Sequence, residues 1–321
     1  MESITVSQEK SPAFAGEALP SDSMEGMASA HLFPVPNGSR RSFLKTLFYG
    51  GAGLALYAGE MERHWIEVSH QDLRIAGLAA PFDGMRIVQL SDVHLDEFSE
   101  PFFLRDAVDR INRLNPDIVL LTGDYVTWGI STRKFAEGAA WQCANLLTGL
   151  HCRQRYAILG NHDVMVDSEL VATALRDNGM KVLINACAPI ERSGARLWLA
   201  GFDDPVMGNP DPELAIPSRI RNIPTEPVVA LCHAPEYADE LLVHPAGRAA
   251  QVMLSGHTHG GQVRLPLIGA TLLPVLGRKY VEGWFHLGGM QLYVNRGLGT
   301  VGVPFRFDCP PEIALFTLRS A

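Results

Sequence analysis

The alternation of apolar and polar residues predicts that strands and helices follow one another along the first half of the chain. Short apolar runs have the length of buried strands, and longer stretches repeat apolar positions at helical spacing. The predicted strands are residues 66–75, 85–90, 117–121 and 156–159, and the predicted helices are residues 101–114, 134–150 and 168–178. Strand and helix in alternation indicate an α/β fold.

The second half of the chain is richer in short strands than in helices. The predicted strands are residues 181–183, 188–192, 197–200, 228–231, 252–255, 291–294 and 312–318. Strand–helix alternation that gives way to strands favours two sheets facing each other with helices outside. We therefore expect a four-layer α/β/β/α sandwich of two mixed sheets.

The N-terminal region has a different composition. Residues 1–38 are rich in Ser, Ala, Glu and Pro and are predicted to be disordered. Residues 39–45 read Ser-Arg-Arg-Ser-Phe-Leu-Lys, and an uncharged run follows at 46–59. This run is short for a bilayer span, which needs about 20 apolar residues. The Arg-Arg frame resembles the twin-arginine export consensus, whose receptor carries folded proteins across a membrane.

We therefore divide the chain into a leader with export signal at 1–59 and one folded domain at 60–321. Export predicts a location in the periplasm or on the outer face of the cytoplasmic membrane. The leader is long, so Met24 and Met27 are alternative starts. The segment at 55–58, Ala-Leu-Tyr-Ala, matches a cleavage site only weakly. Cleavage of the leader and its retention as a membrane tether both stay open.

Charge and cysteine content narrow the possible functions. The net charge of -8 and the pI of about 5.8 argue against a nucleic-acid partner, which needs a basic surface. The five cysteines are widely spaced and form no Cys-x-x-Cys pair. Neither a disulfide framework nor a structural zinc site is therefore expected.

Polar motifs stand directly after the predicted core strands. They are Asp92-Val93-His94, Gly123-Asp124, Gly160-Asn161-His162-Asp163, His233 and Gly256-His257-Thr258-His259. Each motif alone is ordinary, since Gly-Asp is common in turns and a single histidine is often a core residue. As an ordered set at strand ends, where α/β sheets place their sites, they indicate one shared site. The preceding glycines are expected to allow the sharp turns.

The residue types in these motifs suit divalent metal ions. Carboxylate, imidazole and amide oxygen together favour Mn, Fe or Zn. Two such ions would carry more positive charge than Asp92 and Asp124 neutralise, which leaves a site able to hold a phosphate and a hydroxide.

From residue 85 to residue 318 the chain resembles the calcineurin-like metallophosphoesterase superfamily. The resemblance includes Tyr156-Ala-Ile-Leu-Gly-Asn-His-Asp163, Ser255-Gly-His-Thr-His-Gly-Gly-Gln262 and Asn295-Arg-Gly-Leu-Gly-Thr300. It looks closest to the bacterial branch exported by the twin-arginine route. A related branch cleaves the pyrophosphate of UDP-diacylglucosamine.

The resemblance implies a binuclear metal centre and a role for each matching residue. By resemblance, one ion is held by Asp92, His94 and His259, the other by Asn161, His233 and His257, and Asp124 bridges them. His162 would contact the phosphate and protonate or stabilise the leaving oxygen. Asp163 would orient His162 by accepting its other ring N–H. Many relatives carry a further Asp shortly after Gly-Asp, and Tyr125-Val126-Thr127 here contains none.

The implied activity is that of a metal-dependent phosphoric ester hydrolase, in which a metal-activated hydroxide attacks phosphorus in line with the leaving oxygen. Arg264 and Arg296 are candidate substrate-binding residues, because each follows a motif closely. The expected substrate is a small-molecule or lipid-linked phosphomonoester or phosphodiester. The alternatives are a lipid pyrophosphatase of the UDP-diacylglucosamine type and a catalytically silent metal-binding scaffold; a nuclease is disfavoured by the acidic balance.

Overall fold

The computed structural model describes residues 40–96, 100–129, 133–221, 223, 225–270 and 273–321. The chain divides into two compact units, residues 1–47 and 48–321. The disorder and the alternative starts predicted within residues 1–38 lie outside the described residues. Helix α1 (Arg40–Leu56) carries the Arg-Arg pair and most of the apolar run. Across the described part of the chain, no helix combines the length and the apolar character needed to cross a membrane.

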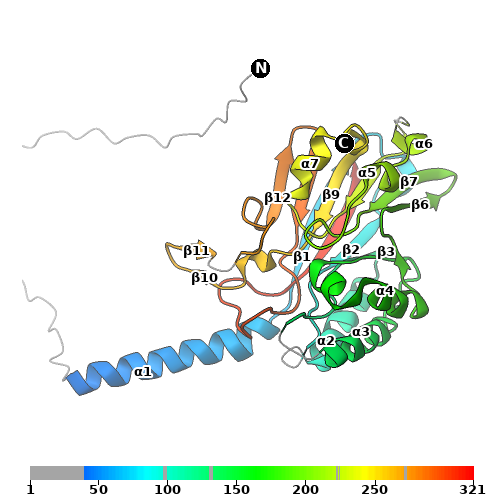
Figure 1. Ribbon diagram of the computed structural model, residues 1–321. Helices are drawn as coiled ribbons and strands as arrows, with labels where there is room; N and C mark the ends of the chain where they lie inside the picture. Colours follow the sequence, from blue (N-terminus) through cyan, green and yellow to red (C-terminus); the bar gives the residue numbers. More distant parts are fainter. Residues whose placement is uncertain (1–39, 97–99, 130–132, 222, 224, 271–272) are drawn as a thin grey trace, which may run out of the picture. The chain divides into compact units, whose positions relative to one another are not determined.

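Two six-stranded mixed sheets form the centre of the second unit (Figure 1). The first sheet has the order β1 (Glu67–Ile75), β14 (Glu312–Ser320), β2 (Arg86–Leu90), β3 (Ile118–Thr122), β4 (Arg155–Ile158) and β5 (Lys181–Val182). The second has the order β12 (Gly283–Leu287), β13 (Met290–Val294), β9 (Ala250–Ser255), β8 (Val228–Leu231), β7 (Ala195–Gly201) and β6 (Ala186–Arg192).

The strand directions place the chemically important loops at the same edges. Strands β2, β3 and β4 are parallel to one another, as are β7, β8, β9 and β13. The carboxyl ends of parallel strands lie at one edge of their sheet. The loops that follow β2, β3 and β4 therefore lie together, and so do those that follow β8, β9 and β13.

The buried apolar side chains of the described residues form three clusters, which fill the space between the layers. One lies between the sheets and draws on both, including Ile87, Leu120, Leu199 and Leu254. The others lie under the outer helices. The helices are α2 (Pro101–Leu114), α3 (Arg133–Leu147) and α4 (Asn161–Asp177) on the first sheet, and α5 (Pro212–Ala215), α6 (Ser218–Arg221) and α7 (Tyr237–Val243) on the second. This arrangement confirms the predicted sandwich.

Local chemistry explains why the predicted elements form where they do. All of β3 is buried, as its unbroken apolar run predicts for a central parallel strand. Helix α2 begins with Pro101 and ends before Asn115, which is left-handed at φ 47°. Its buried face consists of Phe103, Leu104, Ala107, Val108 and Ile111, which recur at helical spacing. The remaining short elements are the helical turns at Tyr57–Met61, Glu62–His64, Ala80–Phe82, Gly247–Ala249 and His259–Gly261, and the hairpin strands β10 (Arg264–Leu265) and β11 (Gly269–Ala270).

The largest difference between a predicted and an observed helix boundary is at the start of α4, whereas α3 ends at Leu147 and not at residue 150. Helix α4 begins at Asn161, whereas the apolar spacing predicted a start at Ser168. The first turn of α4 is polar, so it lacks the apolar positions by which a helix is recognised in the sequence. Extended backbone at Asp167 (φ 179°) also interrupts the helix. The first turn of α4 is therefore the stretch that carries Asn161, His162 and Asp163 to the strand ends.

Candidate metal centre

The predicted ligands lie on loops whose backbone is tightly constrained. Asp92, Asp124 and His257 have positive φ values of 51°, 56° and 73°, and His94 and His259 share this conformation. Residues other than glycine rarely adopt it, although Asp and His do so more often than most. The backbone therefore turns at the ligands themselves.

The glycines before the ligands have two different roles. Gly123 has φ 95°, as expected for a turn glycine. Gly160 and Gly256 do not, so the prediction of a turn role was wrong for them. A Cβ at Gly256 would lie 1.9 Å from Ser91 Oγ, and one at Gly160 would lie 2.3 Å from Asp124 Oδ1. These two glycines instead allow neighbouring loops to approach closely.

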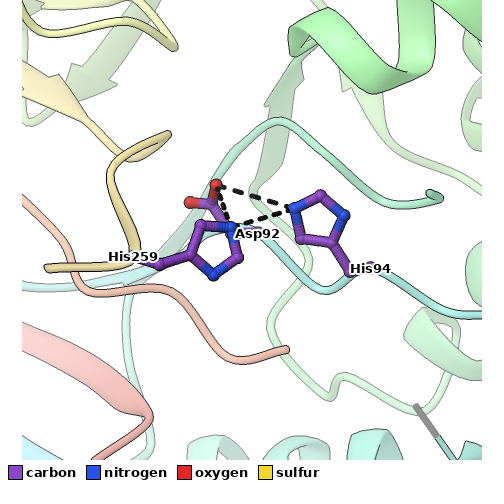
Figure 2. Close-up of side chains that lie close together, drawn as sticks. All are labelled: Asp92, His94 and His259. Atoms are coloured by element: carbon purple, nitrogen blue, oxygen red, sulfur yellow. Dashed lines mark hydrogen bonds and ion pairs between the residues drawn. The ribbon is translucent and has the colours of Figure 1, made fainter. Parts of the chain in front are cut away.

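The first group of ligands joins both sheets. Figure 2 shows Asp92 and His94, which follow β2, facing His259 from the loop after β9. The Nε2 atoms of His94 and His259 are 3.0 Å apart, and Asp92 Oδ1 is 3.4 Å from His259 Nε2. All three residues are buried. Nitrogen and oxygen atoms thus converge on one point.

The second group forms beside the first and shares a residue with it. Asp124, His233 and His257 bring ligand atoms within 4.8 Å of one another. Asp124 Oδ2 lies 3.1 Å from His233 Nε2 and 3.5 Å from His94 Nε2. One carboxylate therefore faces both groups, which is the position that the resemblance implied for the bridging residue.

The hydrogen bonds of the histidines fix which nitrogen faces the centre. His233 Nδ1 lies 2.7 Å from the Thr122 carbonyl, and His257 Nε2 lies 2.7 Å from the Val275 carbonyl. A carbonyl only accepts, so in each ring that nitrogen carries the proton. The other nitrogen then offers its lone pair to the centre, as in metal sites. Burial lowers the pKa of His257 to about 4, which favours the neutral, ligating form.

These residues fit divalent metal ions. The Nε2 atoms of His94 and His259 face each other at 3.0 Å beside a carboxylate, a set of donor atoms that suits a divalent cation. Asn161 Oδ1 is buried and has no hydrogen-bond partner among the described residues. A buried amide oxygen without a partner is costly unless it binds something. Asn161 lines the same cavity as Asp124 and His257, so its oxygen is available to a cation bound there.

Thr127 and Asp96 also support the centre, and the sequence motifs did not identify them. Thr127 donates its hydroxyl proton to Asp96 Oδ2 at 2.8 Å, and His94 Nδ1 lies 3.2 Å from the same hydroxyl. The His94 ring therefore donates to Thr127 and keeps Nε2 free for a metal. Thr127 belongs to the stretch after Gly-Asp in which this chain lacks the usual second aspartate. The only signal was its position three residues after Asp124.

His162 lies beside the ligands, but its ring is held differently from the prediction. Its Nδ1 accepts a hydrogen bond from the Trp128 backbone N–H at 2.9 Å. The neutral ring then carries its proton on Nε2. Burial lowers the pKa of His162, and the negative charge of Asp124 opposes this shift. His162 is thus a neutral N–H donor next to the metal-binding groups.

The predicted contact from Asp163 to the His162 ring was wrong. The Asp163 carboxylate accepts the backbone N–H groups of Gly160 at 2.9 Å, Asp124 at 2.8 Å and Tyr125 at 2.9 Å. It thereby ties the loop after β3 to the first turn of α4. The carboxylate caps the helix because it stands at the third helical position, and this capping competes with any bond to the neighbouring ring.

The two arginines predicted to bind substrate pair with carboxylates instead. Arg264 forms an ion pair with Glu282 and donates to the Gly260 carbonyl at 2.7 Å. Arg296 donates to Glu67 at 2.8 Å and lies 3.5 Å from Glu312. Both arginine side chains pack against Gly260 in the ligand loop. A Cβ added to Gly260 would lie 2.6 Å from the Arg264 side chain. The structure thus brings them to the back of the ligand loop.

A fully buried arginine supports the same region. The Arg306 guanidinium donates to the backbone carbonyls of Arg296, Gly297, Gly299 and Cys309 at 2.6–3.1 Å. Gly299 in turn donates its N–H to the Asp92 carbonyl at 2.7 Å. Arg306 therefore fixes the loop after β13 against the backbone of a metal ligand.

The centre opens into a cavity of about 250 Å³. Metal-binding groups line one part of it, together with His162, and Leu273, Pro274 and Val301 line another. The five cysteines are unpaired and lie outside this lining, and Cys143, Cys232 and Cys309 are buried. The site thus combines clustered metal ligands, a neutral N–H donor and an apolar wall.

This fold and donor set define a metal-dependent hydrolase, and comparison with known proteins gives its family. The calcineurin-like phosphoesterase family profile matches residues 85–261. Metallophosphoesterase YkuE of Bacillus subtilis (strain 168) is 34% identical over 292 residues, which cover 88% of this chain and 98% of the relative. Phosphodiesterase YaeI of Escherichia coli (strain K12) is 31% identical over 290 residues, covering 87% and 99%. The chain belongs to the calcineurin-like phosphoesterase family and is a metal-dependent phosphoester hydrolase.

A third relative has a more specific name. UDP-2,3-diacylglucosamine pyrophosphatase LpxG of Chlamydia trachomatis is 25% identical over 316 residues, which cover 81% of this chain and 91% of the relative. The family therefore includes, at this distance, a protein named for a lipid-linked pyrophosphate.

Proposed function

We propose that the chain is a binuclear phosphoesterase that hydrolyses phosphomonoesters or phosphodiesters at the cell envelope. The observation that carries this proposal is the position of Asp124, whose Oδ2 lies within 3.5 Å of a histidine from each group. A single carboxylate between two groups of ligands suits two ions a short distance apart. The Escherichia coli relative is named a phosphodiesterase, which supports a phosphodiester as the substrate.

Each residue has a defined task in this proposal. Asp92, His94 and His259 hold one divalent ion, and Asn161, His233 and His257 hold the other, with Asp124 between them. When bound, two such ions lower the pKa of a water molecule and neutralise phosphate charge. His162 donates its Nε2 proton to the phosphate or to the leaving oxygen. Mn, Fe and Zn all suit this donor set.

The direct test is an activity panel on purified, metal-depleted protein. Methyl p-nitrophenyl phosphate, p-nitrophenyl phosphate and a nucleoside diphosphate sugar would be assayed after addition of Mn²⁺, Fe²⁺ or Zn²⁺, with ions counted by elemental analysis. Hydrolysis that requires metal, with two ions per chain, supports the proposal. Two bound ions without hydrolysis of any ester would favour the catalytically silent scaffold instead. The presence of His162 argues against that alternative.

A lipid pyrophosphatase is the second candidate, and the similarity to LpxG favours it. The same metal-binding groups would serve both reactions, because each breaks a P–O bond. Cleavage of the sugar nucleotide, without cleavage of the simple diester, would identify this alternative.

We also propose that the chain is exported by the twin-arginine route. The support is the sequence Ser-Arg-Arg-Ser-Phe-Leu-Lys at 39–45, followed by an apolar run. Lysine keeps the charge but lacks the planar guanidinium. Changing Arg40 and Arg41 to Lys together should leave the full-length chain in the cytoplasm in cell fractionation. Unchanged fractionation of the double variant would show that the pair is no export signal, and membrane retention of the uncut chain would support a tether.

A further inference from the structure

The described residues 265–270 and 273–276, which together we call the apolar segment, are unusual for a protein surface. They include no charged and no hydroxyl-bearing residue. Among its described residues, Leu267 and Ile268 have exposed fractions of 108% and 72%, and Val275 of 65%. Single exposed aliphatic residues are common, but several close together mark a binding surface.

The apolar segment begins and ends at the metal centre. It starts just after His259, and its hairpin packs on the ligand loop, because a Cβ at Gly261 would lie 2.2 Å from Ala270 Cβ. Near its end, the Val275 carbonyl accepts the hydrogen bond that orients His257. Leu273 and Pro274 line the cavity beside the metal-binding groups. Apolar side chains of this segment therefore lie both in the cavity lining and on the exposed hairpin.

We propose that the apolar segment binds the alkyl chain of an amphiphilic phosphoester whose phosphate lies at the metal centre. This inference rests on the proposed function and names the substrate class of that site. The phosphate group occupies the cavity, and the chain passes over Leu273 and Pro274 toward Leu267 and Ile268.

The chemistry of the segment selects an alkyl chain over other groups. A nucleobase or a sugar ring is normally bound by hydrogen-bonding side chains or stacked on aromatic rings. The described residues of the apolar segment provide neither, and offer aliphatic side chains only. Such side chains gain free energy in proportion to the hydrocarbon surface they cover, without regard to direction.

The test compares the binding of octyl phosphate and methyl phosphate to the metal-loaded full-length chain by titration calorimetry. Partial burial of the octyl chain should make it bind about tenfold more tightly than the methyl compound. Changing Leu267 and Ile268 together to Ser should reduce this preference to less than about twofold. The matched control is Val243→Ser, since Val243 is also aliphatic, has an exposed fraction of 73% and lies in α7.

Four results would decide the matter. Loss of the octyl preference in the double variant, with the control and all methyl phosphate affinities unchanged, supports the proposal. Equal affinities in the wild-type chain would overturn it, as would a preference that survives in the double variant. A preference that is the same in metal-free protein and is insensitive there to the double substitution would also overturn it, because the chain would then bind elsewhere, for example to exposed apolar residues of α1.

A second measurement separates this inference from the proposed function. The rates of hydrolysis of octyl and methyl p-nitrophenyl phosphate would be compared on the same three proteins. Suppose that neither ester is hydrolysed, but octyl phosphate still binds more tightly than methyl phosphate and the double substitution removes this preference. The proposed hydrolytic function would then be contradicted, and the alkyl-binding site would be supported. If both are hydrolysed at equal kcat/KM with equal affinities, the function stands and the alkyl site fails.

Discussion

The metal-binding loops and the apolar segment border the same cavity, but the chain holds them in opposite ways. The side chains of Asp92 and His94 are fully buried, while Leu267 is fully exposed. The ligand loops are tied by backbone hydrogen bonds and close glycine contacts. The exposed hairpin side chains have no such partners in the described structure. The difference teaches that the metal-binding residues lie on the constrained part of the site, whereas the exposed part is the one to which we assign contact with the rest of the substrate.

The largest expected effect comes from the carboxylate that faces both ligand groups. Asp124→Asn removes a negative charge from between the two proposed ions, so bound metal should fall below two ions per chain. We expect activity to fall by at least about a hundredfold, the upper end of what the loss of a ligand's supporting partner costs. Elemental analysis and an ester assay measure both effects. Two ions per chain in the variant would remove Asp124 from the bridging position.

His162 should separate acid catalysis from metal binding. General acid catalysis contributes about 10²–10⁴-fold, and an alkoxide needs a proton far more than a nitrophenolate does. His162→Ala should therefore keep its metal and lose much more activity on an alkyl ester than on the matching nitrophenyl ester. His257→Ala is the control, because loss of a ligand should reduce activity on both. Equal losses for His162→Ala, with metal intact, would make His162 a phosphate-binding group only.

Thr127 should tune the metal site without contacting the ion. Thr127→Val keeps the shape but removes the hydroxyl between His94 and Asp96. Loss of such a partner typically lowers metal affinity about 10–100-fold. A competitive chelator titration measures this affinity, and Thr173→Val, at a partly buried threonine of α4, is the matched control. An unchanged affinity would mean that Thr127 does not orient His94.

The smallest effect is expected at Arg264. Because its guanidinium pairs with Glu282 and the Gly260 carbonyl, Arg264→Gln should raise KM by less than about fivefold, within the range of a partly exposed ion pair. A much larger rise in KM, with kcat unchanged, would restore the role in substrate binding that the sequence predicted.

The sequence predicted the parts of the molecule that depend on short-range patterns. Apolar runs located the core strands, and the motifs after them located Asp92, Asp124 and His257. What failed depends on contacts between distant residues. Arg264 and Arg296 lie close to motifs in the chain, but their partners Glu282, Glu67 and Glu312 become visible only after folding. Asp163 was assigned to its neighbour in sequence, whereas the third helical position made it a cap that holds the loop of Asp124.

The buried guanidinium of Arg306 has a consequence for how far the chain can be shortened. The backbone N–H of the same residue donates to the Ala58 carbonyl at 3.0 Å, and Gly59 packs against Phe305. Farther along, Glu62 accepts the Cys309 N–H. A protease that cut after Ala58 would loosen the anchor of the loop behind Asp92. Residues just upstream of the first strand thus support the loop behind Asp92, and a cut before Ala58 would leave these contacts in place.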